Sequence, residues 1–262
     1  MENISVAFSD RTNDARIEYI ARRSLENFSR SFVEIAVALE VSDAEFRTLI
    51  PMIGSEHLDA ALAKGAGVLL LSAHLGNFFL VGSRLAVEGY VVSVLVNPPK
   101  DDRLAKLMDK YRLQVGQKTI HARPRQQALK ELHDSMRRNE LAVVIADEYR
   151  HGKGIEVPLF GRTVIARRGP ATVALRTGAA IVPACMIRQP DGTLKLVVEP
   201  ELELDRSGKG AVQIKENMIR ITQWLERTVR THPEQWNWMN IHEWTTHGAD
   251  ETAAREPVRQ AM

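Results

Sequence analysis

Apolar residues in the first part of the chain recur every three or four positions between residues 14 and 40. This period predicts one face of a long helix. A capping box formed by Ser42 and Glu45 begins a short second helix, and Pro51 ends it. We therefore expect residues 1–65 to form an N-terminal helical cap on the main domain. The apolar positions of the long helix are Ile17, Ile20, Ala21, Leu25, Phe28, Phe32, Ile35 and Leu39.

From residue 66 onward, short apolar runs of strand length alternate with helical segments. The predicted strands cover residues 67–73, 90–96, 141–146, 181–187 and 194–198. The predicted helices cover residues 77–88, 101–115, 124–138, 169–176 and 211–231. This alternation predicts an α/β fold: a single domain with a central, mostly parallel mixed sheet flanked by helices. The last two strands can pair antiparallel across a Pro-Asp-Gly turn.

We expect the α/β core to cover residues 66–244 and the polar tail, residues 245–262, to be disordered.

The 262 residues are 44% apolar and 26% charged, as in soluble globular proteins. A net charge of +2 does not indicate a nucleic-acid partner. Because the chain has neither an 18-residue apolar run nor a signal peptide, we expect a peripheral protein on the cytoplasmic side of a membrane. The single cysteine, Cys185, is expected to be a buried apolar residue.

His74 interrupts an apolar stretch, LLSAHLGNFFLVG, at residues 70–82. A single histidine is more often structural than catalytic. Here, however, it follows a strand at the sheet edge where α/β proteins bind ligands. Gly76 permits a sharp turn, and Asn77 is a suitable cap for the next helix, whose N–H groups could receive an oxyanion. This position favours acid–base chemistry.

The residues around His74 resemble a known family. His74-Leu75-Gly76-Asn77-Phe78-Phe79 is similar to the His-x4-acid signature of the lysophospholipid acyltransferase superfamily, and more narrowly to the bacterial lipid A biosynthesis late acyltransferases (lauroyl/myristoyl acyltransferases). Further blocks follow in the family's order across residues 20–244. They are Tyr111-Arg112-x-x-x-Gly116, Ala146-Asp147-Glu148, Val157-Pro158-Leu159-Phe160-Gly161, Gly169-Pro170-Ala171, Leu175-Arg176-Thr177-Gly178-Ala179, Val182-Pro183, and Trp236-x-Trp238 with His242 and Trp244.

The resemblance implies transfer of a fatty acyl chain from acyl carrier protein or acyl-CoA to a hydroxyl of a lipid A-like or other glycolipid at the inner membrane. It implies no cofactor and no metal. In the family, the histidine is the general base, arginines hold phosphate, and backbone N–H groups receive the oxyanion. We therefore expect His74 and Asn77 to act in the reaction. The expected substrate-binding residues are Gly76, Arg112, Arg167, Arg168 and Gly169.

Phe79 departs from the family pattern because it stands at the position of the acid. A phenyl ring can neither orient an imidazole nor stabilise its protonated form, and a comparable change in a Ser-His-Asp triad lowers turnover by about 10⁴. Three explanations remain open. Asp147 or Glu148 approaches His74 in space, a substrate supplies the orientation, or the protein is a weakened or inactive relative that binds a lipid or partner. A thioesterase is a further alternative.

Two other features also allow two interpretations each. Trp236, Trp238 and Trp244 are either core residues or anchors at a membrane interface. The glycine-rich segment 151–161 either cradles a headgroup or simply connects two elements.

Overall fold

Strand β2 (Val68–Ser72) lies at the centre of the sheet, and all five of its residues are buried. Leu69 and Leu71 belong to the apolar cluster on one face, whereas Val68 and Leu70 belong to the cluster on the other. A parallel strand covered on both faces must be apolar on both sides, which explains the unbroken run. The computed structural model describes residues 1–8, 13–149, 154–208, 210–241 and 244.

Seven strands of the described chain form one sheet in the order β1-β9-β8-β2-β5-β3-β4. Neighbouring strands are parallel except for β8 and β9, which are antiparallel. The predicted fold class and the antiparallel pairing of the last two strands are therefore confirmed. Besides β2, the strands of this sheet are β1 (Met52–Ile53), β3 (Val92–Val96), β4 (Gln117–His121), β5 (Leu141–Ile145), β8 (Ala180–Arg188) and β9 (Leu194–Val198).

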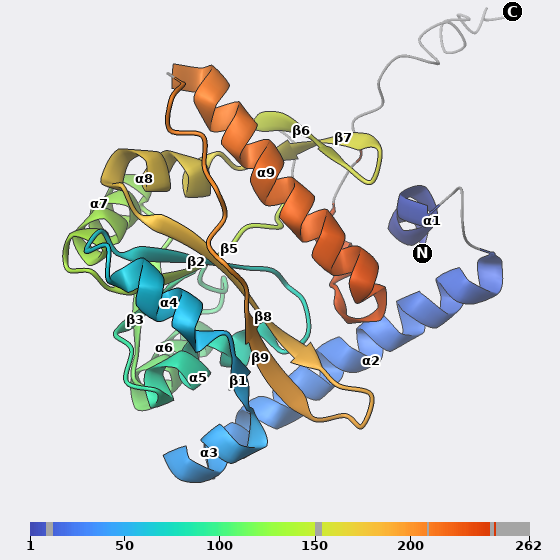
Figure 1. Ribbon diagram of the computed structural model, residues 1–262. Helices are drawn as coiled ribbons and strands as arrows, with labels where there is room; N and C mark the ends of the chain where they lie inside the picture. Colours follow the sequence, from blue (N-terminus) through green and yellow to red (C-terminus); the bar gives the residue numbers. More distant parts are fainter. Residues whose placement is uncertain (9–12, 150–153, 209, 242–243, 245–262) are drawn as a thin grey trace, which may run out of the picture.

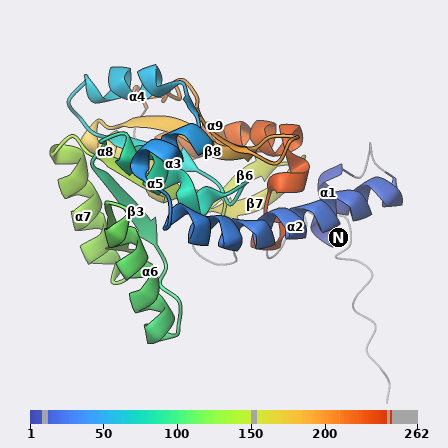
Figure 2. The ribbon, with the colours of Figure 1, turned by 90° about the horizontal axis from the view of Figure 1, so that it is seen from below.

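Helices cover both faces of the sheet, and α9 packs against a separate hairpin, β6 (Ile155–Leu159) and β7 (Arg162–Ala166) (Figure 1). In Figure 2, α2 runs along one margin of the molecule with α1 beside its beginning. The helices are α1 (Glu2–Phe8), α2 (Asp14–Ala38), α3 (Asp43–Leu49), α4 (Ser55–Leu62), α5 (Val81–Val87), α6 (Asp102–Gln114), α7 (Arg125–Arg137), α8 (Gly169–Thr177) and α9 (Gly210–Thr231), with short 3-10 turns η1 (Phe78–Leu80), η2 (Pro233–Gln235) and η3 (Trp238–Asn240).

Several elements differ from the prediction. Strand β4, with the sequence QKTIH, lies at the edge of the sheet, so it lacks the apolar run of a buried strand. Within the glycine-rich segment, residues 155–161 are not a plain connection, because they form β6 and its turn. Phe160 and Gly161 both have positive φ there, as a two-residue hairpin turn requires. The segment 1–65 also contributes β1, which pairs with β9, so it is not purely helical.

The long helix α2 buries Ile17 and Ile20, as its apolar pattern predicts, but from Ser24 onward it buries a different face. Asn13 caps it by accepting a hydrogen bond from the Arg16 N–H. Its buried side chains include Ser24, Asn27 and Ser31, whereas several of its apolar side chains are exposed. The exposed apolar residues of α2 are Tyr19, Leu25, Phe32, Val33 and Val37, and Leu39 follows them at its C-cap.

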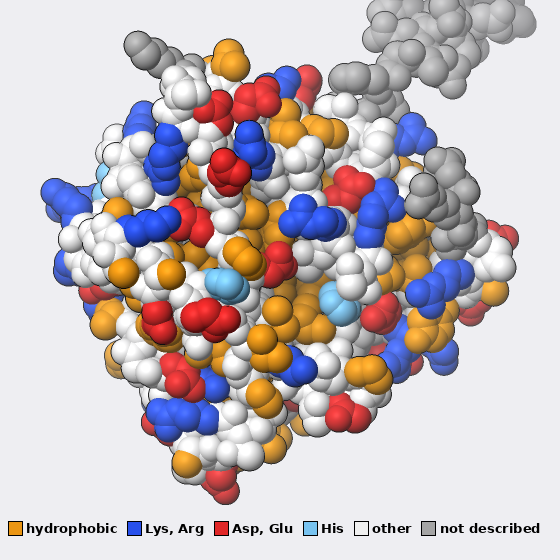
Figure 3. All heavy atoms as spheres, in the orientation of Figure 1, with side chains coloured by type: hydrophobic (Ala, Val, Ile, Leu, Met, Phe, Trp, Pro, Cys, Tyr) orange, Lys and Arg blue, Asp and Glu red, His pale blue; other side chains and the backbone are white. Residues whose placement is uncertain are grey.

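The described helices include none with a stretch apolar enough and long enough to cross a bilayer. On the face in Figure 3, basic, acidic and apolar side chains alternate, so neither sign of charge dominates it, consistent with the net charge of +2.

Candidate functional site

His74 follows β2, and the structure places the carboxylate of Asp147 directly beside it. Asp147 comes two residues after β5, the parallel neighbour of β2, so the two residues leave the same edge of the sheet. His74 Nδ1 lies 2.7 Å from Asp147 Oδ1, and the His74 backbone N–H donates to Asp147 Oδ2 at 2.8 Å. The His74 side chain is 20% exposed, whereas that of Asp147 is completely buried. The ring can therefore meet a substrate while its acid is shielded from water.

The surroundings of Asp147 favour its charged form. Burial alone would raise the pKa of Asp147, but the nearby His74 ring, the indole N–H of Trp236 and the His74 amide outweigh burial and lower it. Asp147 therefore remains a carboxylate at neutral pH. A carboxylate on Nδ1 places the proton on that nitrogen, and the lone pair of the neutral ring is then on Nε2.

Trp236 is a site residue that the sequence did not assign to this role. Its indole Nε1 donates to Asp147 Oδ2 at 2.7 Å, and the residue is fully buried. The segment around it is fastened to the His74 turn, because the Gly76 N–H donates to Gln235 O and the Asn237 N–H donates to His74 O, both at 2.9 Å. The tryptophan motif identified the residue, but its contact with Asp147 spans 89 positions and no local pattern reveals it.

Asn77 does not have the role predicted for it. Its side chain makes no capping bond, and its amide nitrogen donates to Glu34 at 2.8 Å and to Ser31 O at 3.3 Å. Its backbone N–H donates to Met186 O at 3.3 Å. Both of its donors are thus used inside the protein, and the expectation that Asn77 receives an oxyanion is wrong. Glu34 also pairs with the buried Arg188, so Asn77 belongs to a network that fixes the turn to α2 and β8.

Gly76 has a backbone role. It adopts φ +58°, and a Cβ added to it would lie 1.7 Å from Met186 O. Only glycine lets the two backbones approach so closely. The sharp turn predicted at Gly76 is present, and it directs the chain from β2 into η1.

Phe79 packs against α2, where its ring centroid lies 5.5 Å from that of Phe32. Phe78, the preceding residue, contacts the His74 ring edge-on, with centroids 4.6 Å apart. Of the explanations for the missing acid, the approach of another carboxylate is the one that the geometry bears out, and Asp147 is the one hydrogen-bonded to the ring. Glu148 is only partly buried.

The predicted phosphate contacts divide into two groups. Arg112 has an internal partner, Asp109, at 2.9 Å, and its side chain is only 13% exposed. Burial lowers the pKa of Arg112, although Asp109 partly offsets this effect. Arg112 is thus committed to an ion pair on α6. Arg167 and Arg168 are exposed immediately before α8, whose first residue is Gly169.

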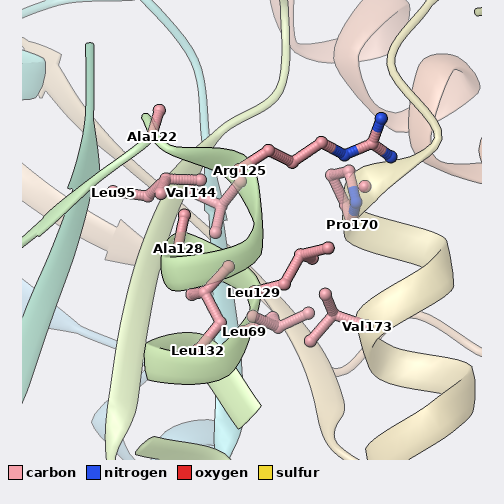
Figure 4. A pocket seen from close by; sticks show the side chains of 11 residues that line it. Leu69, Leu95, Ala122, Arg125, Ala128, Leu129, Leu132, Val144, Pro170 and Val173 are labelled. Atoms are coloured by element: carbon pink, nitrogen blue, oxygen red, sulfur yellow. The ribbon is translucent and has the colours of Figure 1, made fainter.

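An apolar cavity of about 130 Å³ lies between α7, α8 and the sheet. Gly169 and Pro170 are among the residues that line it, and the Arg125 side chain extends toward Pro170 (Figure 4). Val144 of β5, three positions before Asp147, also lines it. An engineered apolar cavity of about 150 Å³ binds benzene, so this recess accommodates only a short segment of an acyl chain. Its other lining residues include Leu69, Leu95, Ala128, Leu129, Leu132 and Val173.

The aromatic and cysteine expectations have clear outcomes. Trp236 and Trp238 are buried, so the core interpretation holds for both and the interface interpretation is wrong. Trp244 is partly buried and donates to Asn3 Oδ1 at 3.0 Å. Cys185 is buried as expected, and burial raises its pKa to about 12. His242, residues 151–153 and the tail 245–262 lie outside the described residues.

Comparisons with known proteins identify the family of this chain. A phosphatidylinositol mannoside acyltransferase of Mycobacterium tuberculosis is 30% identical over 166 residues, which cover 61% of this chain and 52% of that protein. A protein of the same name from Mycolicibacterium smegmatis is 25% identical over 244 residues, covering 90% of this chain and 76% of that protein. The chain thus spans about half the length of the M. tuberculosis relative. The profile of the family described as bacterial lipid A biosynthesis acyltransferase matches residues 1–244, and the chain belongs to that family, as the sequence motifs indicated.

Proposed function

We propose that this protein is an O-acyltransferase that moves a fatty acyl group from a thioester donor to a hydroxyl of a glycolipid. The 2.7 Å contact between His74 Nδ1 and Asp147 Oδ1 carries this proposal. A hydroxyl is a weak nucleophile until a base removes its proton, whereas a thioester is already activated. A partly exposed imidazole with a buried carboxylate behind it supplies that base.

The reaction needs one proton carrier. His74 Nε2 accepts the proton of the acceptor hydroxyl while the hydroxyl oxygen forms a bond to the carbonyl carbon of the thioester. The carbonyl oxygen then becomes an oxyanion. When the C–S bond breaks, the thiolate leaves and takes the proton from His74, so the ester and a free thiol are the products. In place of Asn77, the N–H groups of Phe78 and Phe79 at the start of η1 are the proposed oxyanion donors.

The names of the relatives bear on the acceptor. The mycobacterial relatives are phosphatidylinositol mannoside acyltransferases, whereas the family is named for lipid A. Both acceptors are glycolipids with sugar hydroxyls and a phosphate. Arg167 and Arg168, exposed before the N-terminus of α8, are the proposed phosphate contacts, because arginine pairs bidentately with phosphate. The donor is an acyl carrier protein or coenzyme A thioester, and the apolar cavity beside Gly169 is the proposed recess for part of its chain.

We also propose peripheral membrane contact, at the cytoplasmic side of the inner membrane, through the exposed apolar side of α2. Leu25, Phe32 and Val33 are each more than half exposed there. Phe32 contacts Phe79, Phe79 contacts Phe78, and Phe78 contacts the His74 ring. An apolar path thus connects the surface of α2 with the base, and such a path suits an acceptor whose acyl tails remain in a bilayer.

The deciding experiment compares the wild type with His74→Ala, and His121→Ala on β4 serves as the matched control. Thiol release from acyl-CoA or acyl-ACP is measured with and without glycolipid, and the product is identified by mass spectrometry. We expect acceptor-dependent transfer in the wild type and the control, and at least a 10³-fold loss in His74→Ala. Equal background rates in all three would leave only a lipid- or partner-binding protein. Donor consumption without acceptor would indicate a thioesterase.

A further inference from the structure

The indole of Trp236 contacts the oxygen of Asp147 that does not face the His74 ring. Asp147 Oδ1 lies on His74 Nδ1, whereas Oδ2 accepts from the His74 backbone N–H at 2.8 Å and from Trp236 Nε1 at 2.7 Å. Asp147 thus has two contacts from His74 and one from a distant segment, and among the described residues that distant donor is the Trp236 indole. Asp147 and Trp236 both have 0% exposure, so water does not compete for the bond.

We propose that Trp236 is a positioning residue: its indole N–H holds Asp147 as an oriented anion, and through Asp147 it sets how strongly His74 takes up a proton. This inference rests on the proposed role of His74 as the base and assigns a regulator to that base.

The physical reason is the sharing of charge within one carboxylate. A completely buried carboxylate needs hydrogen-bond donors, because otherwise it binds a proton or turns away. The N–H donor on Oδ2 draws negative charge from Oδ1. The attraction between Oδ1 and a protonated His74 ring is therefore weaker with the indole bond than without it. Removing the indole N–H should make His74 more basic.

The indole is held in place from several sides. The Trp238 ring meets it edge-on, with centroids 4.8 Å apart. Ser24 Oγ of α2 donates to Trp236 O at 2.5 Å, and the Trp236 backbone forms an antiparallel bridge with Leu75. The donor is therefore fixed with respect to the His74 turn before any substrate binds.

Two further titratable side chains, those of Tyr149 and Cys185, interact with Asp147. Burial raises the pKa of Tyr149, and burial also raises the pKa of Cys185 to about 12, so both remain neutral. The charge of Glu199 also raises the pKa of Cys185, and the charge of Glu226 also raises that of Tyr149. The titratable groups near Asp147 thus include His74, Tyr149 and Cys185, together with Glu199 and Glu226, which interact with the last two, and Glu148, which follows Asp147 in the sequence.

The test measures the titration of His74 by NMR of its ring nitrogens in the full chain without substrate, with the signal assigned by comparison with His74→Ala. The variant is Trp236→Phe, which keeps an aromatic ring and removes the N–H. The matched control is Trp238→Phe, which removes an indole N–H from the same cluster, where it donates to Pro233 O at 2.8 Å and not to Asp147. The double variant Trp236→Phe with Asp147→Asn completes a cycle.

We expect the pKa of His74 to rise by roughly half a unit to one unit in Trp236→Phe. The pKa of His74 should not change in Trp238→Phe. The double variant Trp236→Phe with Asp147→Asn should have the same His74 pKa as Asp147→Asn alone. In an active enzyme, the acid limb of kcat/KM should move to higher pH by the same amount. A purely structural tryptophan would lower the yield of folded protein without moving this titration. An unchanged His74 titration in folded Trp236→Phe, or an equal shift in Trp238→Phe, would overturn the inference.

The titration needs no substrate, so the two proposals can fail separately. If the His74 pKa shifts in Trp236→Phe but the wild type transfers no acyl group, only the proposed function is contradicted. If the wild type is active but the His74 pKa does not shift, only this inference is contradicted. If Trp236→Phe does not fold, the wild type is prepared with 5-fluorotryptophan, whose N–H is a stronger donor. The pKa of His74 should then fall, and an unchanged value would contradict the inference.

Discussion

Phe79 lies against Phe32, with ring centroids 5.5 Å apart, at the position where the sequence motif led us to expect an acid. Asp147 instead approaches His74 from the neighbouring strand. The imidazole thus has a carboxylate partner although position 79 carries none. Phe79 packs against α2 instead, and this arrangement leads to the first two predictions.

Asp147→Asn should lower the rate of acyl transfer by about 10³ to 10⁴, because an amide neither fixes the productive tautomer of His74 nor stabilises its protonated ring. The measurement is kcat with a saturating thioester donor and glycolipid acceptor. Glu148→Gln is the matched control and should remain within a few-fold of the wild type. Equal losses in the two variants would mean that Asp147 is not the acid partner of His74.

Phe79→Glu should not increase the rate, because the His74 ring already has its carboxylate. The new charge would lie among the rings of Phe32 and Phe78, so the free energy of unfolding should fall by about 1–3 kcal/mol. Steady-state rates and urea unfolding measure the two effects, with Phe79→Leu as an apolar control. A gain in rate would show that the family position still lacks an acid that the reaction needs.

Ala128→Leu should shorten the preferred acyl chain, because it places three more carbons in the cavity that Ala128 lines. We expect the ratio of kcat/KM for long donors to that for short donors to fall by roughly tenfold. One or two methylenes in an apolar pocket change the difference in activation free energy between two substrates by about 1–3 kcal/mol. Ala44→Leu, on the exposed surface of α3, is the control. An unchanged chain-length preference would place the acyl chain elsewhere.

Replacing Leu25 and Phe32 by Ser should weaken binding to vesicles of anionic phospholipid, because these exposed side chains are the proposed membrane contact of α2. Co-sedimentation should show at least a tenfold loss of the bound fraction relative to the free fraction, if each side chain contributes about 1 kcal/mol or more. Leu113→Ser, on the exposed side of α6, tests whether any exposed leucine has this effect. A similar loss in the control would remove α2 as the specific contact.

Glu140 makes stability depend on pH in the acid range. Hydrogen bonds from Arg138, together with Lys118, lower the pKa of Glu140 from 4.5 to about 2. A carboxyl group with a lowered pKa stabilises the fold above its ordinary pKa, and this contribution is lost as the pH falls toward the lowered value. Between pH 4.5 and pH 2, the free energy of unfolding should therefore fall more steeply in the wild type than in Glu140→Gln. Parallel pH profiles from urea unfolding would contradict this assignment.

The sequence by itself determined the elements whose signals are local. The run at 67–73 predicts a buried strand because a doubly covered strand must be apolar at every position, and β2 occupies residues 68–72. The ordered motifs identified the family, and the turn at Gly76 identified His74 as the candidate base. Strand β4 escaped prediction because an edge strand has few apolar positions. Beyond Ile20, the buried face of α2 was mistaken because Ser24 and Asn27 have hydrogen-bond partners on distant segments.

Only the tertiary structure decided how the candidate residues are combined. It joined His74, Asp147 and Trp236, which are separated by 73 and 89 positions, because two parallel strands end at the same edge and the C-terminal segment is bridged to the His74 turn. It also turned Asn77 inward and gave Arg112 an internal partner. Hydrogen bonds and ion pairs between distant segments have no period along the chain, so residue types and spacing identify the candidates, whereas the paths of the strands decide which of them meet.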